Sequence, residues 1–142
     1  MYAALRALPA PDDVVEQCFH AASLLREHRG DGHIAALVSE GVSGLEAHAL
    51  FALSMDLPAE RFGRIHHLPA AQLAGIVGGL RQRGLVGEDG WLTPAGRAVH
   101  DRVEALTDDL AAKPYEVLSA AELDELVSLL APMAELLVAA AD

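Results

Sequence analysis

The sequence predicts an all-α fold interrupted by one short β-hairpin. Apolar residues recur with the helical period of about 3.6 in nearly every segment that shows a period. The one good strand pattern is formed by residues 85–86 and 91–93, on either side of a Gly-Glu-Asp-Gly turn. Two S-x-x-E sequences, which start at Ser43 and Ser119, have the form of capping boxes at helix starts. We therefore expect helices throughout the chain and a single hairpin.

Residues 1–41 are expected to form two helices joined by a Gly-Asp-Gly break. After an extended lead, one of the two aspartates at 12–13 can cap a helix that runs to Arg29 and ends at Gly30. Asp31 can then cap a second, short helix. The apolar face of the first helix is formed by Val14, Val15, Cys18, Phe19, Ala22 and Leu25. On this interpretation Cys18 is a small buried hydrophobe.

Residues 42–93 have the order of a helix-turn-helix followed by the hairpin. The capping box at Ser43 begins a helix that continues to about Met55. Two more helices are expected, from Pro58 to about His66 and from Pro69 to Arg83, with Gly84 as the stop after the second.

Residues 94–142 are expected to form two long helices. Thr93 with Pro94 begins the first and Pro114 ends it, since Thr is a good N-cap and Pro fits the first helical position. The last helix repeats apolar residues close to coiled-coil spacing: Leu123, Leu126, Leu130, Met133 and Leu137. A stripe this apolar is expected to be covered by a second copy in a homodimer. All 142 residues are expected to make a single domain.

Composition excludes several classes of protein. The net charge of −11 repels phosphate on average, so nucleic-acid binding would need a local basic patch. The single cysteine rules out an internal disulfide or a cysteine zinc cluster, and with no signal peptide it favours the cytoplasm. The longest apolar run is shorter than the ~20 residues of a membrane span. No cofactor, metal site or membrane contact is expected, and no catalytic motif assigns a catalytic residue.

Two segments resemble known families. LRQRGLV at Leu80–Val86 and LTPAGR at Leu92–Arg97, with the order of elements around them, resemble the winged helix of MarR-type regulators. That resemblance implies a winged helix-turn-helix that dimerises through its terminal helices. More narrowly, Phe19–Val38 resembles the corresponding segment of actinobacterial helix-turn-helix proteins called SalK-like, and the match extends over nearly the whole chain.

The densest chemistry lies between residues 25 and 38, where the sequence is LREHRGDGHIAALV. On a helical wheel of about 100° per residue, Arg26 and Arg29 fall within the apolar arc and are expected to point inward. A buried arginine needs a carboxylate or an anionic ligand. The break would also place its two histidines at opposite helix ends, where one imidazole would donate a proton and the other accept one, and free N–H groups at a helix start bind anions.

Two interpretations of this cluster remain open. In the first it is an anion or small-molecule site made by Arg26, His28, Arg29, Asp31 and His33. In the second it is an internal ion-pair network, with partners among Asp31, Glu46, Asp101 and Glu104.

The DNA-binding alternative has weaker support. A recognition helix reads base edges with polar or basic side chains, and Gln72 is the one such residue in the first turns of the helix from Pro69. Phosphate contacts could come from Arg61, Arg64, Arg81 and Arg83. The hairpin tip, Glu88-Asp89, is acidic, and glycines at 75, 78 and 79 suggest close packing of the helix against a neighbour.

The sequence as a whole favours a cytoplasmic homodimer that binds a small, anionic molecule, with catalysis in secondary metabolism left open. The first alternative is a MarR-type transcription regulator that binds DNA. The second is a dimerisation module for a partner chain.

Overall fold

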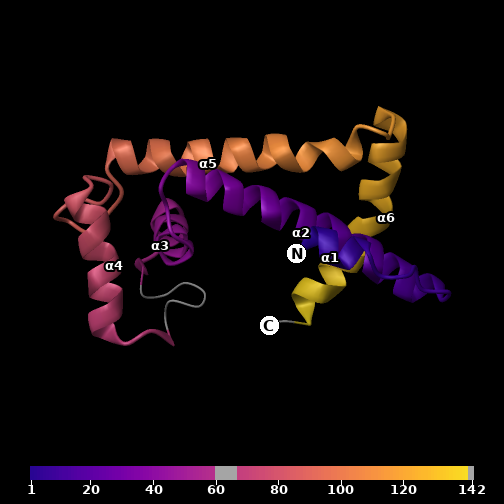
Figure 1. Cartoon of the computed structure of the whole chain (residues 1–142), viewed down its shortest axis with the longest axis horizontal. Helices are drawn as coiled ribbons and strands as arrows, with labels where there is room; N and C mark the ends of the chain where they lie inside the picture. The colour runs from indigo at the N-terminus through magenta and orange to yellow at the C-terminus, as the bar shows by residue number, and fades with distance from the viewer. Residues whose placement is uncertain (60–66, 141–142) are drawn as a thin grey trace. The chain divides into compact units, whose positions relative to one another are not determined.

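The computed structural model describes residues 1–59 and 67–140. Its helices are α1 (Tyr2–Arg6), α2 (Val14–Ser39), α3 (Gly44–Ser54), α4 (Ala70–Gln82), α5 (Pro94–Ala112), a 3-10 helix (Lys113–Tyr115) and α6 (Ala120–Ala139) (Figure 1). The chain forms two compact units, Met1–Ala111 and Ala112–Asp142, which are described separately. The helix expected from Pro58 to His66 falls largely outside the described residues.

α2 runs without interruption from Val14 to Ser39, so the expected break at residues 30–32 is wrong. Asp13 caps the helix as expected, because its carboxylate accepts hydrogen bonds from the N–H groups of Val15 and Glu16. A helix-interior glycine costs only about 0.5–1 kcal/mol relative to alanine, which good helix formers and tertiary packing on either side can offset. The two glycines therefore do not stop this helix.

Gly32 has a packing role instead. A Cβ atom at this position would lie 3.1 Å from the Cβ of Leu110 on α5. The missing side chain lets the C-terminal half of α2 approach α5 closely, and the two helices lie next to each other in Figure 1. Glycine therefore marks a helix contact here and not a helix end.

The core of the first unit lies where the C-terminal part of α2 meets α3, α4 and α5. Its buried apolar residues are Ala36, Leu37, Val42, Ala49, Leu50, Leu53, Ala59, Leu73, Leu80, Leu85, Val86, Val99 and Val103. The capping box of α3 is confirmed: Ser43 accepts from the Glu46 N–H, and the Glu46 carboxylate accepts from the Ser43 N–H.

The β-hairpin is absent, and the expected winged-helix fold is therefore wrong. In the described residues no strand forms, and the segment retains one isolated antiparallel bridge between Val86 and Leu92. The turn itself is present, because the Gly87 N–H donates to the Trp91 carbonyl at 2.8 Å. Gly84 bends the chain with φ +71° directly before this segment, and α5 begins directly after it. Too few residues remain on either side of the turn for a ladder.

The start of α5 is fixed by a close backbone contact. The Thr93 hydroxyl accepts from the Gly96 N–H at 3.0 Å and donates to the Gly84 carbonyl at 2.6 Å. A Cβ atom at Gly96 would lie 2.0 Å from the Leu85 carbonyl oxygen, so only glycine fits. The expected start at Thr93-Pro94 is confirmed, and α5 ends at Ala112, shortly before Pro114.

The N-terminal half of α2 is not buried in this unit, contrary to expectation. Val15 and Phe19 are each 76% exposed, and Cys18 is exposed as well. The expected extended lead is also wrong in part, because residues 2–6 form α1, a helix of five residues that packs on α2. So short a helix cannot cover the apolar arc.

The second unit consists of the 3-10 helix and α6. The capping box at Ser119 and Glu122 is confirmed, and the helix continues through Pro132 to Ala139. Its expected apolar stripe is largely exposed, with Leu130 at 50% and Leu137 at 72%. Across the described residues no single helix is long and apolar enough to cross a membrane; α2 and α3 pass that test only as a pair bent by 94°.

The uninterrupted α2 predicts the sign of a glycine substitution. A Cβ at Gly30 would meet no atom within 4 Å, so Gly30→Ala should raise the free energy of unfolding by about 0.5–1 kcal/mol. Gly41, with φ +63°, is the matched control, and Gly41→Ala should destabilise by about 1 kcal/mol. Urea unfolding followed by circular dichroism measures both. Destabilisation by Gly30→Ala would show that α2 ends at the Gly-Asp-Gly segment.

Candidate functional site

A cavity of about 360 Å³ lies in the first unit between α2, α3 and α5. Its apolar lining is formed by Ile34, Leu37, Ala47, Leu50, Phe51 and Val103, and Gly44 adds backbone. Its polar lining is formed by Arg29, His33, His48, His100 and Glu104. An apolar floor with a few polar groups, in a volume of this size, is typical of small-molecule sites.

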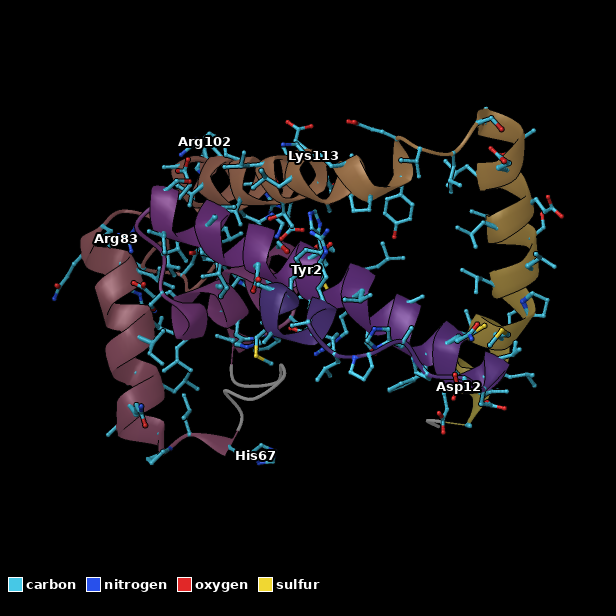
Figure 2. All side chains as sticks on the ribbon, turned by 45° about the vertical axis from the view of Figure 1, so that its right-hand side comes forward. Tyr2, Asp12, His67, Arg83, Arg102 and Lys113 are labelled. Atoms are coloured by element: carbon cyan, nitrogen blue, oxygen red, sulfur yellow. The ribbon has the colours of Figure 1, made fainter. Side chains whose placement is uncertain are left out.

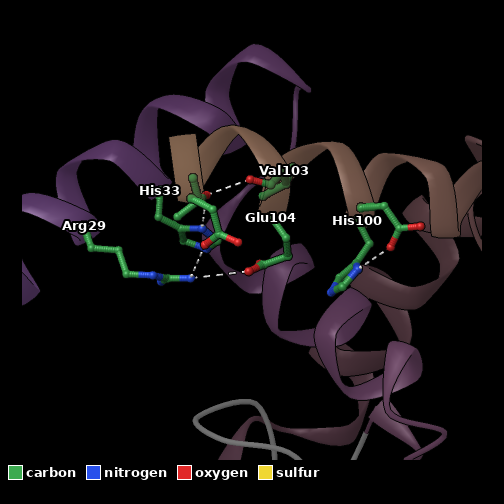
Figure 3. Close-up of polar contacts among 8 residues, drawn as sticks. Arg29, His33, His100, Val103 and Glu104 are labelled. Carbon is green, nitrogen blue, oxygen red and sulfur yellow. Dashed lines mark hydrogen bonds and ion pairs between the residues drawn. The ribbon is translucent and has the colours of Figure 1, made fainter. Parts of the chain in front are cut away.

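Arg29 reaches across from α2 to α5 at the cavity (Figure 3). Its Nη2 lies 3.4 Å from Oε2 of Glu104 and 3.9 Å from Oδ1 of Asp108. Arg29 is 49% exposed and Glu104 is 34% exposed, so water screens this pair. The guanidinium has five N–H donors, and its remaining donors have no partner among the described residues.

His33 joins the same two helices through a hydrogen bond. Its Nδ1 lies 3.0 Å from Oγ1 of Thr107, a residue that is completely buried. The Thr107 hydroxyl in turn donates to the Val103 carbonyl at 2.7 Å, one turn earlier in α5. The orientation of the His33 ring at the cavity is therefore set from α5.

His100 supplies a second imidazole from α5 itself. Its Nδ1 lies 3.2 Å from Oδ1 of Asp101, and its side chain is 17% exposed (Figure 3). The ring faces Phe51 on α3 with 6.3 Å between ring centroids. Its Nε2 is buried and has no hydrogen-bond partner among the described residues. An unpaired buried nitrogen beside a cavity is a candidate ligand contact.

The structure brings together two of the five residues expected in the site. Arg29 and His33 are one turn apart on α2 and line the cavity. Arg26 does not point inward as expected: it is 81% exposed and pairs with its neighbour Glu27. His28 faces away from the cavity and packs edge-on against the Tyr2 ring, with 5.2 Å between ring centroids.

Asp31 holds the N-terminal helix and is not part of the cavity. Its carboxylate accepts from the Met1 amino group and from the Tyr2 N–H, each at 3.1 Å. These hydrogen bonds, that of the amino group first, lower the pKa of Asp31 below its ordinary value. Because α2 is continuous here, the expected anion site at a helix start is absent, as is the expected placement of His28 and His33 at opposite helix ends.

Sequence reasoning missed His48 and His100 as cavity residues. Each is an isolated histidine on its helix, and such residues carry no signal above an ordinary surface or core position. Their helical spacing places them on the faces of α3 and α5 that meet α2, which becomes informative only once the packing of the helices is known.

The residues proposed for DNA contact are only partly available. Gln72 is exposed on α4, but Nε of Arg81 donates to the Gly87 carbonyl at 3.1 Å. Nη1 of Arg83 donates to Oε1 of Glu46 at 3.0 Å. Burial raises the pKa of Glu46, but hydrogen bonds from Ser43 and the nearby Arg83 outweigh it and leave that pKa below its ordinary value.

Arg61 and Arg64 lie outside the described residues. The glycines of α4 do not pack closely as expected, because a Cβ at Gly75, Gly78 or Gly79 would meet no described atom within 4 Å. The face of α4 is therefore open and nearly uncharged. Arg102, which is labelled on α5 in Figure 2, forms a bidentate pair with Glu40 at the C-terminal end of α2, at 2.7 and 3.1 Å.

Among residues 1–59 and 67–140, no three His, Cys, Asp or Glu side chains gather in an arrangement that could hold a metal ion.

In comparisons with known proteins, the model of a helix-turn-helix family matches residues 1–142, the whole of the chain. Comparison with curated proteins and with solved structures gave no match.

Proposed function

The chain belongs to a helix-turn-helix family, and we propose that its cavity between α2, α3 and α5 binds a small molecule with an apolar body and an acidic end. The observation that carries this proposal is the cavity itself, which combines an apolar floor with Arg29, His33 and His100. A solvated ion-pair network would not require a cavity of ligand size.

Arg29 is the expected contact for the acidic end. Its pair with Glu104 is long and exposed and uses only one edge of the guanidinium, so a carboxylate can bind the other donors. Glu104 opposes such a ligand, because its negative charge lies at the same guanidinium. Removal of the Glu104 charge should therefore strengthen anion binding, whereas removal of the Arg29 charge should weaken it.

Three phenyl compounds of similar size test this proposal: phenylacetate, phenylacetamide and phenethylamine. We expect phenylacetate to bind best, in the millimolar range or tighter, a range set by the few contacts that so small a ligand can make. Arg29→Gln should weaken its binding several-fold and Glu104→Gln should strengthen it several-fold. Chemical shifts of the cavity histidines and isothermal titration calorimetry provide the measurement.

Arg26→Gln is the matched control, because it removes the same charge from the same helix outside the cavity. It should leave phenylacetate binding unchanged. The proposal is wrong if none of the three compounds shifts the cavity histidines at millimolar concentration, or if Arg26→Gln and Arg29→Gln weaken binding equally.

DNA binding is the second candidate function, and the family match favours it. The described surface limits its strength, because α4 offers Gln72 and open glycines while Arg83 is paired with Glu46. The net charge of −11 also weakens DNA binding, because it repels the phosphates. Duplex DNA should therefore bind weakly and without sequence preference.

Selection from random duplexes, followed by salt titration, measures this directly. Any binding found should fall steeply with salt and show no consensus. A recovered motif that binds in the nanomolar range at physiological salt would make the protein a DNA-binding regulator and overturn this expectation.

Self-association through α6 is also part of the proposal. The exposed stripe that contains Leu130, Met133 and Leu137 is larger than a solvated helix normally displays. A partner chain on the same stripe is the alternative occupant.

We also propose that the chain is a SalK-like member of the helix-turn-helix family, because Phe19–Val38 is similar to the corresponding segment of SalK-like proteins.

Light scattering tests the homodimer. We expect a dimer at tens of micromolar, roughly the range that includes weak dimers. Leu130→Glu should dissociate it, because a charge would be buried against an apolar face. Ser128→Glu adds the same charge two residues away and should leave the dimer intact. A wild-type monomer at this concentration would exclude the homodimer.

A further inference from the structure

Two of the cavity imidazoles have their Nδ1 atoms in contact with groups that act there only as hydrogen-bond acceptors. The hydroxyl of Thr107 has one hydrogen, and that hydrogen is donated to the Val103 carbonyl. The contact between His33 Nδ1 and Thr107 Oγ1 is therefore made by an Nδ1–H group that donates to the hydroxyl oxygen. Thr107 thus selects the tautomer of His33 that leaves a lone pair on Nε2.

Asp101 makes the same selection at His100. A carboxylate is only an acceptor, so the contact of 3.2 Å requires a proton on Nδ1 of His100. In the neutral ring the Nε2 atom then carries a lone pair. That atom is buried without a protein partner, which is a costly arrangement unless something else donates to it.

Both Nε2 lone pairs belong to rings that line the cavity, whereas Thr107 and Asp101 lie outside the lining. The remaining titratable groups of the lining are Arg29 on α2, His48 on α3 and Glu104 on α5. While they are neutral, the rings of His33 and His100 offer no hydrogen-bond donor to the cavity. A ligand acceptor would therefore find a donor at Arg29, and a ligand donor would find acceptors at His33 and His100 as well as at the Glu104 carboxylate.

We infer that the cavity selects molecules that carry a hydroxyl or N–H donor on an apolar body, with Thr107 and Asp101 as positioning residues that fix the acceptor tautomers of His33 and His100. This inference rests on the proposed function and narrows its ligand class. On this inference a ligand donor forms the hydrogen bond that the buried Nε2 of His100 lacks within the protein. Protonation of either ring would replace the acceptor by a donor and abolish the selection.

The tautomers are measured without any ligand, by long-range ¹H–¹⁵N NMR of the full chain at a pH where both imidazoles are neutral. We expect His33 and His100 to carry the proton on Nδ1. Thr107→Val removes the acceptor, so His33 should no longer hold its proton only on Nδ1. Thr107→Ser keeps the hydroxyl and should preserve the proton on Nδ1. Asp101→Ala should allow the other tautomer of His100, whereas Asp101→Glu keeps a carboxylate, which only accepts, and should preserve the proton on Nδ1.

The ligand class is tested with the three hydroxyphenylacetate isomers against the three fluorophenylacetate isomers. Fluorine is close to a hydroxyl in size and cannot donate. At least one hydroxyl isomer should bind about tenfold more tightly than its fluoro counterpart, the factor expected for one well-formed hydrogen bond. Thr107→Val or Asp101→Ala should remove that preference while phenylacetate itself still binds.

The outcomes separate this inference from the proposed function. Loss of all binding, including that of phenylacetate, would overturn the proposed function. Binding of phenylacetate without any preference for a hydroxyl would overturn only the inferred ligand class. A proton on Nε2 of both rings in the wild-type protein would overturn the inferred role of Thr107 and Asp101, whatever the variants do.

Discussion

The close packing of α2 against α5 is the contact on which the cavity depends. A missing side chain permits it, because Gly32 on α2 admits Leu110 on α5. Along the same seam His33 meets Thr107, and Glu40 meets Arg102. Only when α2 passes through residues 30–32 as one helix do Arg29 and His33 share a face with Leu37 and lie opposite Val103.

Local signals allowed much of the secondary structure to be predicted. The caps at Asp13, Ser43 and Ser119 are each confirmed by backbone hydrogen bonds, because capping is decided within about four residues. The Gly-Asp-Gly segment was misinterpreted because a helix-interior glycine and a helix-ending glycine look alike in sequence. What distinguishes them is Leu110, about 80 positions away, and its contact is a tertiary one. The predicted β-hairpin is wrong for a different reason. Its turn is present, but too few residues flank the turn for strand pairing.

The candidate site was predictable only in part, because it too depends on tertiary contacts. Its dense charged segment was visible, but the helical period sends Arg29 and His33 to the cavity and His28 and Asp31 to the side that meets α1. His48 and His100 come from other helices and carry no signal of their own. Sequence alone could identify the helix that supplies the site, whereas the packing of α3 and α5 decides which of its residues belong to it.

The polar contacts of α4 and those of the cavity differ in what they leave unsatisfied. On α4, Arg81 and Arg83 are already bound to the protein, to the Gly87 carbonyl and to Glu46. In the cavity, Arg29 keeps unused donors, and His100 keeps a buried acceptor that nothing in the described chain satisfies. Folding alone does not favour an unpaired buried nitrogen, because its lost hydration is not returned by any protein contact. A bound molecule would return it, and for this reason the unsatisfied groups favour the cavity over α4 as the place for the proposed ligand.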